Sequence, residues 1–174
     1  EQVQAVLTIV EEVKQELSED NVNFNPKVPL GIMIETPAAA LIADHLAKVV
    51  DFFSIGTNDL TQYTNCVDRE NAKVSHLFTE FHPAVIRLIK NTIEAAHSEN
   101  IEVSVCGELA GSLEGAILLV GMGIRTLSVS PRKINKIKEI LSRFTLQEIE
   151  QIAAETLKYP DATTVLSTIK SFIK

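Results

Sequence analysis

Four short apolar segments, each followed by a polar turn and a helix-forming stretch, constrain the fold of this chain more than any other feature. They lie at residues 31–34, 52–55, 102–106 and 126–129, and their length indicates strands. Strand, loop and helix repeated in this order are typical of a parallel sheet with right-handed crossovers. Because the segments are uniformly apolar, we expect both faces of the sheet to be covered.

Two α/β architectures accommodate four such units: a doubly wound open sheet, and part of a (β/α)8 barrel. Four units in about 130 residues match half of the roughly 250 residues of an eight-unit barrel, which favours the half barrel. Two helices near residues 145–156 and 163–173 are expected to follow the last unit. The chain opens on Glu1 in an amphipathic helix that runs to about residue 19 and has no cap signal ahead of it. We therefore expect the sequence to be a piece of a longer polypeptide.

Composition disfavours several classes of protein. With 174 residues and 45% hydrophobic content, the chain is long enough for one domain with a sizeable core. Its formal net charge of −7 argues against nucleic acid or an anionic membrane as the main partner, because neither attracts an acidic surface. Cys66 and Cys106 are too few for a disulfide scaffold, and we find no signal-peptide pattern or long apolar span. The expected location is the cytoplasm, without membrane insertion.

The connections between the strands carry their own signals. The second strand is expected to break at Gly56 and open into a loop, with Thr57 or Asn58 capping the next element of the chain. The longest irregular segment then spans roughly residues 61–82, and a loop of that length in a compact domain is usually functional. The first crossover helix is predicted to start at Thr36-Pro37. Its expected buried face consists of Leu41, Ile42, Leu46 and Val49.

Three chemically useful side chains end or follow the predicted strands. Glu35, Asp59 and Cys106 should therefore meet at one rim of a parallel sheet. Two carboxylates that converge there without a nearby lysine suit a hard divalent ion such as Mg²⁺. The alternative is that Glu35 and Asp59 cap helices at their own loops, and spacing alone slightly favours it. Cys106 is open to three interpretations: a nucleophile, a proton donor or a small core residue.

A phosphate site is the second possibility at this rim. Arg69 follows Asp59 on the long loop, and a guanidinium makes a strong bidentate contact with phosphate. The N–H groups of Asn58 and Asp59, where the backbone turns after Gly56, are suited to the same ligand. A lone loop arginine is more often a solvated charge. Four histidines show no metal-ligand or catalytic spacing: His45, His76, His82 and His97.

Three runs together resemble one family. They are GIMIETPAA at 31–39, DFFSIGTNDLTQY at 51–63 with VDR at 67–69, and CGELAG at 106–111. Over essentially its whole length the chain resembles the carboxy-terminal part of enzyme I of the bacterial phosphoenolpyruvate-dependent sugar phosphotransferase system. Pyruvate phosphate dikinase and phosphoenolpyruvate synthase share the strand-end residues and are the alternative. Ser112 departs from the aspartate that is common in the family.

The resemblance implies the C-terminal half of a TIM-type barrel and a role for each site residue. Glu35 and Asp59 are then Mg²⁺ ligands, while Asn58 and Arg69, with the Asp59 amide, bind phosphoenolpyruvate. Cys106 is the acid that protonates the enolate carbon. A proton donor must keep its proton near neutrality, and an ordinary thiol, with a pKa of about 8.5, does so.

The resemblance also implies a reaction and partners. The phosphoryl group of phosphoenolpyruvate passes to a histidine of the enzyme and on to a histidine-containing phosphocarrier protein for sugar uptake, and pyruvate is released. The accepting histidine lies in an amino-terminal domain that, like the first half of the barrel, is expected outside this sequence. We therefore expect residues 1–174 alone to have little or no activity.

Self-association is a further expectation. A half barrel leaves two unpaired sheet edges, at residues 31–35 and 126–129, and such edges are templates for pairing. The family is also dimeric through this domain, so a homodimer is expected. A different class of function stays open, in which the chain is a non-catalytic binding or dimerisation module and its strand-end residues are structural caps.

Overall fold

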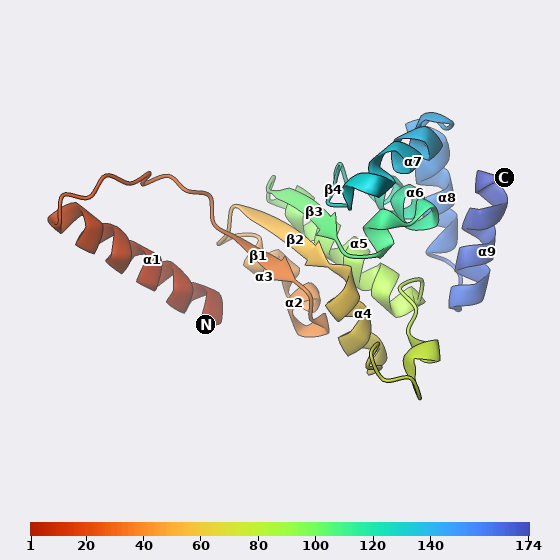
Figure 1. Ribbon diagram of the computed structural model, residues 1–174, viewed down its shortest axis with the longest axis horizontal. Helices are drawn as coiled ribbons and strands as arrows, with labels where there is room; N and C mark the ends of the chain where they lie inside the picture. Colours follow the sequence, from red (N-terminus) through yellow and green to blue (C-terminus); the bar gives the residue numbers. More distant parts are fainter.

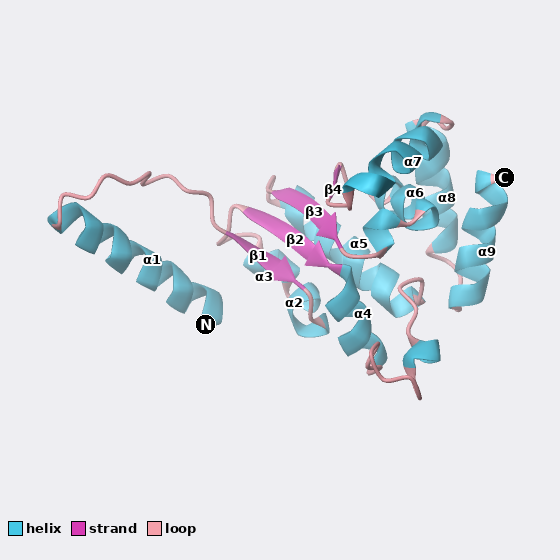
Figure 2. Cartoon of the chain, viewed as in Figure 1, coloured by secondary structure: helices cyan, strands magenta, loops and turns pink.

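A computed structural model of residues 1–174 contains one four-stranded parallel sheet in the order β1-β2-β3-β4 (Figures 1 and 2). The strands are β1 Gly31–Ile34, β2 Phe52–Gly56, β3 Glu102–Cys106 and β4 Thr126–Leu127. The predicted α/β fold with a parallel sheet is confirmed. The fourth strand is two residues long rather than four, because only Thr126 and Leu127 pair with β3 before the chain turns into the next helix.

Helices fill every connection. Between β1 and β2 lie α2 Pro37–Leu41 and α3 Ala43–Leu46; between β2 and β3 lie α4 Thr57–Asn65, η1 Ser75–Leu77 and α5 Pro83–Ser98. The connection from β3 to β4 contains η2 Leu109–Gly111 and α6 Leu113–Gly121, and the chain ends with α7 Pro131–Ser142, α8 Leu146–Thr156 and α9 Ala162–Ile173. The two predicted carboxy-terminal helices are confirmed, and they pack with α6.

Burial alternates along the strands, so the prediction that both sheet faces are covered is wrong for residues 1–174. Phe53, Ile55 and Val105 point to one face and are fully buried in the main core. On the other face Met33 and Phe52 are 50% and 36% exposed. Helix α5 packs against β2 and β3, which covers one side of the sheet only.

The first crossover helix starts as predicted but buries different residues. Thr36 Oγ1 accepts a hydrogen bond from Ala39 N, with Pro37 in the first turn. The helix then breaks at Ile42 into α2 and α3, which changes the phase of its inward face. The buried residues are small: Ala40, Ala43 and Ala47. The predicted apolar face is wrong, because three of its members are exposed and one is half-buried: Leu41, Ile42, Val49 and Leu46.

Strand β2 passes directly into α4, so the predicted loop after Gly56 does not exist. Gly56 is the N-cap, and no side chain caps the helix. Neither Thr57 nor Asn58 caps the helix, because both already lie in its first turn, and their side chains are bonded to other segments. The irregular segment begins only at Cys66, where a left-handed residue (φ 53°) ends α4, and it extends to residue 82.

Helix α1 Gln2–Glu19 lies apart from the other elements beyond β1 (Figure 1). Its predicted extent is confirmed, but it contains no buried residue, and Val6 and Val13 are exposed. Only Val3 reaches the main core. None of the helices combines the length and apolar character needed to span a lipid bilayer.

Candidate functional site

The carboxyl ends of β1, β2 and β3 meet at one rim of the sheet. Gly56 pairs with Cys106, and Ile34 pairs with Ile55, so Glu35 follows β1 at the level where the other two strands end. A methyl group at Gly56 would lie 3.1 Å from Glu35 Oε2. The Glu35 side chain therefore reaches the end of β2 at Gly56, and Gly56 precedes Asp59 by three residues.

Asn58, Asp59 and Arg69 lie close together beside this rim. Arg69 Nη2 is 3.9 Å from Asp59 Oδ1, and both side chains are about 40% exposed. Asn58 and Arg69 line one cavity of about 420 Å³, whose remaining walls are Glu70, Ser75, Phe78 and Glu108. Glu35 and Cys106 do not line it. The structure thus joins the two residues predicted to bind phosphate, with Asp59 as their neighbour.

Asn58 already holds a neighbouring segment. Its Oδ1 accepts a hydrogen bond of 2.9 Å from Glu108 N, which leaves Nδ2 as its remaining donor group. Asn58 and Asp59 also belong to the first turn of α4, where backbone N–H groups have no carbonyl partner inside the helix. Such a turn, with its positive helix-dipole end, favours an anion.

The Cys106 thiol is half-buried and donates to Ile55 O at 3.5 Å, with Ser54 Oγ at 3.7 Å. The thiol is thus in contact with the backbone and a side chain of β2. Cys66 differs, because it is exposed on the irregular segment and lies in no cluster with the other site residues.

Glu80 is a half-buried acid at this rim that sequence reasoning missed. Its Oε1 accepts hydrogen bonds from Thr57 Oγ1 at 2.9 Å and from Leu109 N at 3.0 Å. Burial raises the pKa of the Glu80 carboxyl above its ordinary value, although these two hydrogen bonds lower it. The sequence indicates its importance only by placing it in the long irregular segment. A single glutamate in such a segment matches no motif that would predict a role for it.

The carboxylates of Glu35 and Asp59 fit a Mg²⁺ site in number and type of ligand. No group of three or more His, Cys, Asp or Glu side chains converges anywhere in residues 1–174. Mg²⁺ is commonly held by one or two carboxylates together with waters and substrate phosphates, so two acids at an open rim are sufficient.

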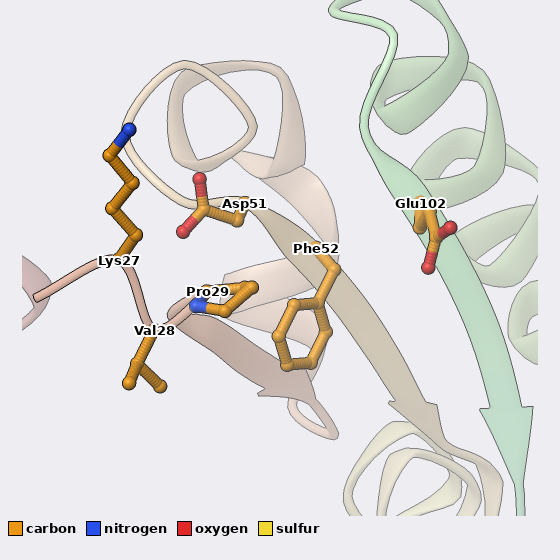
Figure 3. A pocket seen from close by; sticks show the side chains of 6 residues that line it. All are labelled: Lys27, Val28, Pro29, Asp51, Phe52 and Glu102. Atoms are coloured by element: carbon orange, nitrogen blue, oxygen red, sulfur yellow. The ribbon is translucent and has the colours of Figure 1, made fainter. Parts of the chain in front are cut away.

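A second cavity, of about 460 Å³, lies at the opposite rim (Figure 3). Its lining comes from the segment before β1 and from the amino ends of β2 and β3: Lys27, Val28, Pro29, Asp51, Phe52 and Glu102. Asp51 Oδ2 accepts a hydrogen bond of 2.7 Å from Leu30 N, so this acid holds the backbone. None of the predicted site residues is here.

Comparisons with known proteins identify relatives. A family model described as "PEP-utilising enzyme, PEP-binding domain" matches residues 1–146. The phosphoenolpyruvate-protein phosphotransferase of Buchnera aphidicola subsp. Baizongia pistaciae is 45% identical over 173 residues, which cover 99% of this chain and 30% of the relative. The protein of that name from Haemophilus influenzae is 42% identical with the same coverage. The one from Enterococcus faecalis is 44% identical over 157 residues, 90% of this chain and 27% of the relative. The chain therefore spans less than a third of the length of these relatives.

The turn after β3 generates a testable prediction. Gly107 has φ +110°, and a methyl group there would overlap Thr57 Oγ1 and lie 2.9 Å from Asn58 Oδ1. We expect Gly107→Ala to lower the free energy of unfolding by about 1–3 kcal/mol through backbone strain, with a further loss from the steric clash. Urea unfolding of the 174-residue chain measures this.

Gly111→Ala is the matched control. Its added methyl group meets only the flexible end of the Lys133 side chain, and its φ is not positive. We expect a loss of less than about 1 kcal/mol, as for most surface substitutions. Equal losses in the two variants would contradict the account of this turn.

Proposed function

The chain belongs to the family of phosphoenolpyruvate-utilising enzymes, and from that membership we propose that it is the phosphoenolpyruvate-binding part of a phosphoenolpyruvate-protein phosphotransferase. The reaction proposed is transfer of the phosphoryl group to a histidine of the enzyme and then to a histidine-containing phosphocarrier protein. The single observation that supports a substrate site best is the cavity that joins Asn58 and Arg69 beside Asp59.

Residues 1–174 supply, in this proposal, the C-terminal half of a (β/α)8 barrel and the helices that follow it. The other half of the barrel and the phosphohistidine domain lie outside these residues. Two features support a half barrel: the sheet has free edges at β1 and β4, and the face that bears Met33 and Phe52 is poorly covered. The same free edges support the proposed homodimer. We place the enzyme in the cytoplasm.

The phosphate of the substrate is bound at the amino end of α4. The Arg69 guanidinium donates two parallel hydrogen bonds to its oxygens, and Asn58 Nδ2 and the first-turn N–H groups add others. Asp59 lies 3.9 Å from Arg69, so the guanidinium is already oriented toward this rim before substrate arrives. A guanidinium held in place favours phosphoryl transfer, because the protein accelerates this reaction mainly by positioning the phosphate and stabilising its charge.

Glu35 and Asp59 would hold Mg²⁺. When bound, the ion neutralises charge on the phosphate and on the enolate oxygen. Glu35 suits this role because its carboxylate lies over Gly56, which has no side chain of its own to fill that space.

Cys106 supplies the proton that completes the reaction. Cleavage of the phosphorus–oxygen bond leaves the enolate of pyruvate, and its methylene carbon takes the proton from Cys106 Sγ. The thiol gives up its hydrogen bond to Ile55 O in this step and regains a proton from water. The phosphoryl group goes to a histidine outside residues 1–174, since none of the four histidines here lies at the rim cavity.

The first test of the proposal is binding. In the natural full-length protein, Mg²⁺ with phosphoenolpyruvate should slow amide hydrogen exchange in the peptide that covers residues 56–63, and phosphoenolpyruvate without Mg²⁺ should do so less. Asp59→Asn should remove the Mg²⁺ dependence, whereas Asp44→Asn, an exposed acid on α3, should not. Protection that needs neither Mg²⁺ nor Asp59 would refute the proposed metal site.

A second test isolates the proton donor. Cys106→Ala should lower kcat by about 10²–10⁴-fold, the usual contribution of a general acid, while binding of phosphoenolpyruvate stays nearly unchanged. Cys66→Ala makes the same chemical change on the exposed irregular segment and should leave kcat unaltered. Pyruvate release by coupled assay measures both; a fully active Cys106→Ala enzyme would exclude the thiol as the acid.

A third test concerns residues 1–174 alone. Because the accepting histidine is proposed to lie elsewhere, the 174-residue chain should release no pyruvate from phosphoenolpyruvate with Mg²⁺ and phosphocarrier protein present. Measurable release of pyruvate would refute the proposal that the accepting histidine lies outside residues 1–174. Binding without turnover would also separate the proposal from a purely structural dimerisation module, which should bind no phosphoenolpyruvate.

A further inference from the structure

Glu80 connects three segments of the rim through one oxygen atom. Thr57 Oγ1 and Leu109 N both donate to Glu80 Oε1, at 2.9 and 3.0 Å, and both partner residues are fully buried. Thr57 directly precedes Asn58 and Asp59, and Leu109 follows Cys106 by three residues. Glu80 itself lies near the end of the irregular segment on which Arg69 also lies. One carboxyl thus contacts every segment of the rim except the end of β1.

The start of α4 and the residues after β3 are also joined without Glu80. Thr57 Oγ1 lies 3.2 Å from Cys106 O, and Asn58 Oδ1 accepts from Glu108 N at 2.9 Å. A hydroxyl has one proton, so Thr57 donates either to Glu80 or to the Cys106 carbonyl. The distinct contribution of Glu80 is therefore to attach the third segment, residues 66–82, to the other two.

That segment has few other attachments. Residues 68–73 are all exposed, and the Arg69 side chain is held only by its contact with Asp59. Two other side-chain bonds join α4 to residues 68–82 of the segment: Asn65 Nδ2 donates to Thr79 O at 3.2 Å, and Arg69 N donates to Gln62 Oε1 at 3.3 Å. Loss of the Glu80 bonds would therefore leave the segment attached to α4 but would remove its bond to the residues after β3, at Leu109 N.

The charge of Glu80 has no partner that would explain its burial. No lysine, arginine or histidine forms an ion pair with it. Lys133 attracts it and Glu108 repels it, and burial is the larger influence, raising the pKa of this carboxyl. A proton on Oε2 leaves Oε1 able to accept both hydrogen bonds, so the contact persists in either protonation state. Glutamine presents the same acceptor.

We propose that Glu80 is a positioning residue that fixes the segment bearing Arg69 against the start of α4, which bears Asn58, and against the residues that follow Cys106. The inference rests on the proposed function, because it assigns Glu80 to the geometry of that site. Its role is acceptance of two hydrogen bonds, and its charge is not required.

Two variants at this position test the proposal in the natural full-length protein, each checked for an intact melting transition. Glu80→Ala removes the acceptor and should lower kcat by roughly 10–100-fold, as misplacement of catalytic groups does. Glu80→Gln keeps the acceptor and should lose less than about tenfold. Glu99→Ala, which removes an exposed acid at the end of α5, is the control and should leave kcat unchanged. A merely structural role would lower the melting temperature of Glu80→Ala but not its kcat.

A variant of Thr57 tests the same hydrogen bond should Glu80→Ala fail to fold. Thr57→Val keeps the shape of the side chain and removes the hydroxyl, so it should lower kcat in the same direction. In the Glu80→Ala background Thr57→Val should have a smaller effect than in the wild type, because Glu80→Ala has already removed the hydrogen bond that the two residues share. Additive effects, or equal damage by Glu80→Gln and Glu80→Ala, would overturn the proposal.

Hydrogen exchange separates this inference from the proposed function. The Leu109 amide of the 174-residue chain should exchange faster in Glu80→Ala than in wild type and Glu80→Gln. If the natural protein releases no pyruvate, the proposed function fails, but faster Leu109 exchange in Glu80→Ala would still support the connection. Equal exchange in wild type and Glu80→Ala would overturn the positioning role even in an active enzyme.

Discussion

The contact between the Gly107 backbone and the first turn of α4 is the constraint on which the candidate site depends. Strands β2 and β3 end side by side at Gly56 and Cys106, so the segments that follow them must share one small space. Gly107 fits this space for two reasons: its φ of +110° is one that glycine adopts readily, and Thr57 Oγ1 occupies the position that a side chain would need. The α4 amide groups and the Cys106 thiol are thereby held at a fixed separation.

Strand register extends this constraint to the acids. Glu35 leaves β1 one residue after Ile34 pairs with Ile55, which brings its carboxylate over Gly56. Asp59 lies in the first turn of α4, whose amide groups point back toward the carboxyl ends of the strands. Opposite charges therefore collect at one rim: two acids, one arginine and a helix amino end. The other rim has the cavity around Phe52, in which Asp51 accepts a hydrogen bond from Leu30 N.

Sequence reasoning predicted the strands and the strand-end residues well, because apolar runs of four or five residues between turns have few alternatives. It failed where tertiary contacts decide. The first crossover buries Ala40 and Ala43 rather than Leu41, since α5 approaches closely enough for Asn91 Nδ2 to reach Ala40 O at 2.8 Å. Helix α4 starts without a side-chain cap because its N-cap is Gly56, and Thr57 inside the first turn is bonded to Glu80, a residue 23 positions away. No local pattern in the sequence encodes that bond.

The central claim is that one rim of the sheet binds magnesium and phosphoenolpyruvate together. The most direct measurement is a crystal structure of the natural full-length protein with Mg²⁺ and phosphoenolpyruvate. The account predicts the metal between Glu35 and Asp59, and the phosphate against Arg69 and the amino end of α4. Phosphoenolpyruvate bound at the opposite rim, near Lys27 and Phe52, or a metal away from Glu35, would contradict it.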